Sequence, residues 1–165
     1  MLLVLEGHSS QRDVIAGARD ALPPSVQIFA SHREQRPEIT GLADVAWTEP
    51  SDNTVRVDWV IDKALSNSIE VVLAGKFGQL YEAHRGRFEA NGIRLVTGCI
   101  SLEGLQIVED KGRFTAAALA GGLNCIPGVP VTSSEQLVAV YHDLVLQGPV
   151  CVKPVAGVYG QGFWR

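Results

Sequence analysis

The feature that most constrains this chain is a regular alternation between short apolar runs and helical patterns over residues 1–98. The run at residues 2–5 is continuous, which is typical of a strand that is buried on both faces. We expect further strands at residues 26–30, 45–47, 71–74 and 93–96. Between them, apolar residues recur at helical spacing within residues 14–22, 57–65 and 80–91. The alternation predicts an α/β fold, in which helices cover both faces of a parallel sheet.

Three residues near the ends of predicted strands are candidates for substrate binding, because ligands of open parallel sheets bind at the carboxyl ends of the strands. His8 and Ser9 follow the first strand, and Lys76 follows the fourth. They could meet an anionic or carboxylate substrate. The alternative is that they are solvated loop residues beside the tight-turn glycines Gly7 and Gly75.

The alternation of strand and helix patterns ends after Gly98. We therefore place a domain boundary near residues 99–110 and predict two domains, 1–100 and 101–165. Residues 100–108 are mixed in character. A helix is expected from residue 109 to 119, and a second one, capped by serine and glutamate, from 133 to 145. A strand at 150–153 and a glycine-rich loop at 157–162 follow.

The strongest local signal is the lysine that ends this last strand, Lys153, followed by the glycines Gly157, Gly160 and Gly162. A lysine supplies a point charge, and glycines let backbone N–H groups approach phosphate oxygens. The pattern therefore suits a polyphosphate. It is neither a Walker A loop nor a dinucleotide fingerprint, because the order of lysine and glycines differs. On spacing alone, a plain hairpin turn remains the alternative.

A second signal is Asp110-Lys111 at the start of a predicted helix. Asp110 favours a helix N-terminus through the helix dipole, whereas a lysine there is mildly unfavourable. The cation at Lys111 suggests a bound counter-anion. An ordinary exposed lysine is the alternative interpretation.

In combination, these features resemble the ATP-grasp superfamily, which includes the carbamoyl-phosphate synthase large subunit and biotin carboxylase-like ligases. The resemblance spans the chain and is most specific over residues 109–163. It implies a Rossmann-like pre-ATP-grasp domain over residues 1–100 and the first part of an α+β ATP-grasp domain over 101–165. The motifs that carry it are Asp110-Lys111, Phe114, Leu119, the loop 124–127, the capped helix from Ser133, Lys153-Pro154 and the three glycines.

The resemblance also implies what these residues do. Lys111 and Lys153 would contact the phosphates of ATP, and Gly157, Gly160 and Gly162 would close over them. Ligases of this family phosphorylate a carboxylate to an acylphosphate, which an amine, a thiol or a similar nucleophile attacks, with Mg²⁺ bridging the phosphates.

The purine contacts and the Mg²⁺ ligands of the family are expected beyond residue 165, so we expect a truncated chain with no metal site that is inactive alone. We also expect Val150, Val152, Phe163 and Trp164 to form an unpaired sheet edge or to meet another chain. That chain would be a second copy or the missing C-terminal half.

Two alternative functions differ from a ligase. Residues 1–98 could form a non-catalytic small-molecule module, with a tail that binds a nucleotide without turnover. A dinucleotide-binding domain is disfavoured, because the first turn lacks GxGxxG and Ala30-Ser31-His32, rather than an acidic residue, ends the second strand.

Composition excludes several other classes. The net charge of −4 disfavours sequence-independent nucleic-acid binding, which needs a basic face. No apolar run approaches the roughly 18 residues of a membrane helix, and we expect a cytoplasmic protein. Cys99, Cys125 and Cys151 contain no CxxC pair, so each is expected to be a small buried hydrophobic residue rather than a disulfide or zinc ligand.

Overall fold

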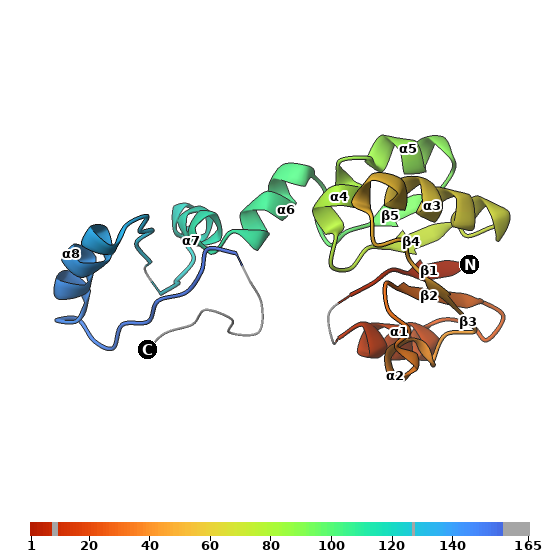
Figure 1. Cartoon of the computed structure of the whole chain (residues 1–165), viewed down its shortest axis with the longest axis horizontal. Coiled ribbons are helices and arrows are strands. Elements are labelled where there is room, and N and C mark those ends of the chain that lie inside the picture. The colour runs from red at the N-terminus through yellow and green to blue at the C-terminus, as the bar shows by residue number, and fades with distance from the viewer. Residues whose placement is uncertain (8–9, 127, 157–165) are drawn as a thin grey trace. The chain divides into compact units, whose positions relative to one another are not determined.

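The computed structural model describes residues 1–7, 10–126 and 128–156 of the chain (Figure 1). The chain divides into two compact units, Met1–Leu105 and Gln106–Arg165.

The first unit is built on a five-stranded sheet in the order β3-β2-β1-β4-β5. Every neighbouring pair is parallel. The strands are β1 (Leu2–Val4), β2 (Ile28–His32), β3 (Val45–Thr48), β4 (Val71–Leu73) and β5 (Arg94–Val96). The predicted parallel sheet and its five strands are therefore confirmed.

Strand β2 begins and ends two residues later than predicted, at residues 28–32 rather than 26–30. The apolar run ends at Ala30, but the strand continues through Ser31 and His32, and all five of its residues are buried. The Ser31 hydroxyl donates a 2.7 Å hydrogen bond to Glu49. A polar residue can therefore occupy a buried strand position, because its partner satisfies it there.

Helices cover both faces of the sheet, as Figure 1 shows: α1 and α2 lie on one side, and α3, α4 and α5 on the other. Two buried clusters fill these interfaces, the larger one between the sheet and α3 to α5. The helices are α1 (Gln11–Ala21), α2 (Pro37–Thr40), α3 (Asn53–Ser66), α4 (Gly78–Glu82) and α5 (Arg85–Ala90). The predicted α/β architecture is thus confirmed on both faces.

The single helix predicted over residues 80–91 is wrong, because the structure divides it into α4 and α5. The break is at residues 83–84, where the His84 amide donates to the Tyr81 carbonyl, three residues back. Beyond this turn, the Arg85 side chain reaches both Glu82 and the carbonyl of Leu95 on β5. The break therefore places a cation against the outer strand of the sheet.

A further helix, α6 (Leu102–Glu109), spans the stretch that the sequence analysis describes as mixed. Its first turn is held by the Ser101 hydroxyl, which accepts a 3.1 Å hydrogen bond from the Gly104 amide. The serine supplies the capping signal, and Gly104, a poor helix former, obscures it.

The second unit contains α7 (Lys111–Ala120) and α8 (Ser134–Leu144), and both predicted helices are confirmed. The Asp110 carboxylate accepts a hydrogen bond from the Arg113 amide at 2.9 Å. The Ser133 hydroxyl accepts one from the Gln136 amide at 3.2 Å. Each helix thus begins at a side-chain cap that satisfies one of its free N–H groups.

The strand predicted over residues 150–153 is not observed. In the described part of the chain, Val152 alone forms a one-residue bridge there. A strand needs successive pairings with a neighbour, and an apolar run by itself does not supply them. The predicted edge residues Phe163 and Trp164 lie outside the described residues.

The cysteine prediction is also wrong in part. Cys99 and Cys125 are half-buried, whereas Cys151 is exposed, and all three are free thiols. Among the described residues, no helix combines the length and apolar character needed to cross a membrane.

Candidate functional site

The carboxyl edge of the sheet has a topological switch point, at which the strand order changes direction. Strand β1 pairs with β2 on one side and with β4 on the other, and the order runs outward from β1 in both directions. Ligands of open parallel sheets bind at such a switch point. Glu6 follows β1 at this place and Lys76 follows β4.

Glu6 is the centre of the side-chain cluster at this edge. Its side chain is only 3% exposed, yet it meets two cations. Arg33 Nε donates to Glu6 Oε2 at 2.6 Å, and Arg33 Nη2 donates to Oε1 at 3.0 Å. Lys76 Nζ lies 3.8 Å from Oε1, which is an ion pair but longer than a hydrogen bond.

The charge state of Glu6 follows from these contacts. Burial acts to raise the pKa of its carboxyl, but the hydrogen bonds and the positive charge of Arg33 outweigh burial. The pKa of Glu6 therefore lies below its ordinary value, and the carboxylate is held in its ionised form.

A backbone hydrogen bond joins the segments that follow β1 and β4. The Lys76 amide donates to the Glu6 carbonyl at 2.8 Å. A Cβ atom at Gly75 would lie 2.3 Å from the same carbonyl oxygen. Gly75 is therefore required by the close approach of the loops that follow β1 and β4.

Glu49, which follows β3, connects this edge to the core. Its Oε1 accepts hydrogen bonds from the Glu6 amide and the Ser31 hydroxyl, both at 2.7 Å. Its Oε2 lies 3.5 Å from Nη1 of Arg56 in α3, and both side chains are fully buried. Arg56 Nη2 also donates to the Pro50 carbonyl at 2.8 Å. Glu49, in the loop after β3, thus links the loop after β1 and strand β2 to α3 through one buried ion pair.

Three cationic side chains lie around the aromatic ring of Phe77. The guanidinium carbons of Arg56 and Arg33 lie 4.1 and 5.0 Å from the ring centroid, and Lys76 Nζ lies 5.7 Å away. The nearby Tyr81 hydroxyl is buried without a hydrogen-bond partner among the described residues. Burial raises the pKa of Tyr81, so its hydroxyl stays protonated.

The structure thus places Lys76 at the switch point, whereas the candidates His8 and Ser9 lie outside the described residues. Four residues of this cluster were not predicted from the sequence: Glu6, Arg33, Glu49 and Arg56. The one available signal was that a charged residue, Glu6, directly follows the first apolar run.

In the second unit, the structure brings the start of α7 to the segment that carries Lys153. The Lys111 amide donates to the Val155 carbonyl at 3.1 Å, and Lys111 Nζ lies 3.5 Å from the same oxygen. These residues are 44 positions apart in the sequence. Lys153, two residues before Val155, is exposed. Gly157, Gly160 and Gly162 lie outside the described residues.

The donor set of this segment fits phosphates better than metal ions. Lys111 and Lys153 are cations, which suit phosphate oxygens. Over residues 1–7, 10–126 and 128–156, no group of three or more histidine, cysteine, aspartate or glutamate side chains could hold a metal ion. The described cations of this segment, Lys111 and Lys153, therefore suit an anionic ligand better than a metal ion.

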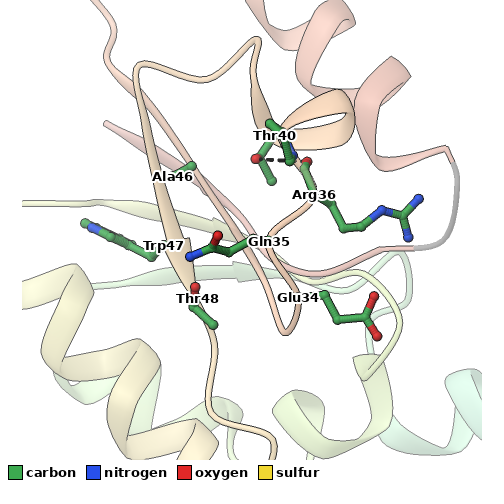
Figure 2. A pocket seen from close by; sticks show the side chains of 8 residues that line it. Glu34, Gln35, Arg36, Thr40, Ala46, Trp47 and Thr48 are labelled. Atoms are coloured by element: carbon green, nitrogen blue, oxygen red, sulfur yellow. Dashed lines mark hydrogen bonds between the residues drawn. The ribbon is translucent and has the colours of Figure 1, made fainter.

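A pocket of about 280 Å³ lies at the outer edge of the sheet, beside β3. Figure 2 shows that the charged ends of Glu34 and Arg36 point away from Trp47. The Thr40 hydroxyl already donates to the Arg36 carbonyl at 3.2 Å. No charged groups among the described residues point into this pocket together. The switch point and the contact between Lys111 and Val155 are therefore the stronger candidate sites.

Comparison with known proteins gives a match at the level of structure alone. No family model matches the chain, and no curated protein sequence matches it. The biotin carboxylase domain of 2-oxoglutarate carboxylase from Hydrogenobacter thermophilus, a domain dimer in complex with MgADP, ADP and bicarbonate, matches with a TM-score of 0.66. The identity is 19%, over 99% of this chain and 36% of that chain.

A second solved structure is N5-carboxyaminoimidazole synthetase from Staphylococcus aureus, complexed with ADP. It matches with a TM-score of 0.65 at 10% identity, over 95% of this chain and 39% of that chain. The biotin carboxylase subunit of pyruvate carboxylase matches with a TM-score of 0.52 at 18% identity, over 98% and 36% of the two chains. This chain therefore spans less than two fifths of the length of these structures. The predicted resemblance is confirmed as a shared fold: the chain has the fold of the N-terminal part of biotin carboxylase-like ATP-grasp enzymes.

Proposed function

We propose that the chain is the N-terminal portion of an ATP-dependent ATP-grasp ligase. This ligase would activate a carboxylate as an acylphosphate for attack by an amine or another nucleophile. The observation that supports the proposal most directly is the contact between Lys111 and Val155, which brings the two predicted phosphate-binding segments together. The shared fold with ADP-bound carboxylases adds support.

Each predicted residue has a role in this proposal. Lys111 and Lys153 neutralise the phosphate charge that develops during transfer, and the loop with Gly157, Gly160 and Gly162 covers the phosphates. A bound Mg²⁺ would supply further neutralisation of the phosphate charge. Its ligands are proposed to lie beyond residue 165, and residues 1–165 alone are proposed to be inactive.

The partners of the chain are also part of the proposal. The substrate is a small carboxylate, and the enzyme works in the cytoplasm without nucleic acid or membrane. A homodimer is proposed by analogy with the biotin carboxylase domain dimer. An unpaired edge at Val150 and Val152 remains a prediction.

The test is ATP-dependent ADP release by the protein that carries this chain. We expect Lys111→Ala and Lys153→Ala each to lower the rate about 100-fold or more, the usual cost of removing one preorganised transition-state donor. Arg113→Ala is the matched control, because Arg113 is an exposed cation within the first turn of the same helix. Unchanged turnover in both lysine variants would contradict the proposal. ATP binding without ADP release in the unmodified protein would favour a non-catalytic nucleotide-binding module instead.

A further inference from the structure

The cluster at the sheet's carboxyl edge contains more positive charge than a structural ion pair needs. Arg33 alone satisfies both carboxylate oxygens of Glu6. Lys76 is a second cation on the same carboxylate, at 3.8 Å. A buried carboxylate is compensated by one well-placed cation, so Lys76 is in excess.

The two buried carboxylates and the three cations around Phe77 give a net charge of +1. The carboxylates are Glu6 and Glu49, and the cations are Arg33, Arg56 and Lys76. The negative charges lie inside, since neither carboxylate side chain is more than 3% exposed. The exposed side is positive, because the side chains of Arg33 and Lys76 are 33% and 39% exposed.

Both exposed cations keep donors for a ligand. The hydrogen bonds of Arg33 to Glu6 use Nε and Nη2, so Nη1 has no hydrogen bond to a described residue. Lys76 Nζ makes no hydrogen bond to Glu6 at its distance of 3.8 Å. The buried pair Glu49–Arg56 and the backbone contact at Gly75 hold this edge in place before a ligand arrives.

We propose that Arg33 and Lys76 form a binding site for the carboxylate group of a small molecule, at the switch point between β1 and β4. The site deepens the proposed function and rests on it for the substrate class, since an ATP-grasp ligase takes a carboxylate. The anion neutralises the excess charge, and the fork of Arg33 and the point charge of Lys76 hold it. Glu34, next to Arg33 in the chain, also acts on Arg33, but it is exposed, so solvent screens its charge.

The experiment is a titration of the full protein with sodium acetate and, separately, with inorganic phosphate, at constant ionic strength. Backbone amide chemical shifts of residues 33 and 75–77 report binding. We expect saturable shifts with acetate, and about tenfold weaker binding in Lys76→Gln, which corresponds to the loss of one charge-assisted contact. Lys76→Arg retains the charge and should restore binding.

Lys63→Gln is the matched control, because Lys63 is a lysine of the same unit that lies over Trp47 and Trp59 instead. Lys76→Gln is preferred to a change at Arg33, whose loss would leave Glu6 buried without its main partner. Acetate shifts that are absent, that do not saturate, or that are equal in Lys76→Gln would overturn the site. Binding of phosphate without acetate would overturn its carboxylate class. The titration needs no ATP, so its failure and a failure of ADP release are separate results.

Discussion

At the scale of single residues, the buried pair Glu49–Arg56 organises the carboxyl edge of the sheet. Both side chains are fully buried, and Glu49 accepts two hydrogen bonds of 2.7 Å, one from the loop after β1 and one from Ser31 in β2. Removing one partner of such a pair leaves a buried charge without compensation. The pair therefore couples the stability of the unit to the geometry of the candidate site.

We expect Glu49→Gln to lower the free energy of unfolding by about 3–5 kcal/mol, because Arg56 would remain buried without its counter-charge. Urea denaturation of the two proteins measures the difference. Glu89→Gln is the control, since Glu89 is exposed and lies 3.8 Å from Arg85, and an ion pair of an exposed carboxylate contributes about 1 kcal/mol or less. Equal losses in the two variants would show that the buried pair has no special role.

Of this cluster, Lys76 alone was predicted from the sequence. Glu6, Arg33, Glu49 and Lys76 follow four different strands, and only the strand order brings them together. Lys76 was predicted because it follows an apolar run and a glycine. Its partners were missed because charged residues after a strand are common and their pairing depends on contacts distant in sequence.

At the scale of elements, the five strands were predictable because each contains a short stretch rich in apolar residues. The strand predicted at residues 150–153 is not observed, because a strand depends on a neighbouring strand as well as on its own sequence. Helices α7 and α8 were predictable because Asp110 and Ser133 are capping residues, and both make the expected hydrogen bonds.

The contact between the loops after β1 and β4 gives a prediction at this scale. We expect Gly75→Ala to lower the free energy of unfolding by about 1–3 kcal/mol, as overpacking does, because the new Cβ would overlap the Glu6 carbonyl. Thermal or urea unfolding measures the change. Gly86→Ala is the control: its Cβ would have nothing within 4 Å, and Gly86 lies in α5. Alanine there should be neutral or stabilising by up to about 1 kcal/mol. If Gly75→Ala behaved like Gly86→Ala, the close approach would not constrain the fold.

At the scale of the whole molecule, the two units differ in how completely they are packed. The first has two buried clusters around a sheet. Within the described part of residues 106–156, Ala118 alone is buried, while Phe114 on α7 and Val138 on α8 are about half exposed. The prediction that another chain or further sequence meets this unit remains a prediction.

The central claim at this scale is that Lys111 and Lys153 hold the polyphosphate of a nucleotide together. Calorimetric affinities of ATP and AMP, measured with the full protein and with Lys153→Ala, test it directly. The difference between the two nucleotides isolates the contribution of the β- and γ-phosphates. We expect the unmodified protein to bind ATP at least about tenfold more tightly than AMP, and Lys153→Ala to remove most of that preference. An equal preference for ATP in both proteins would contradict the claim.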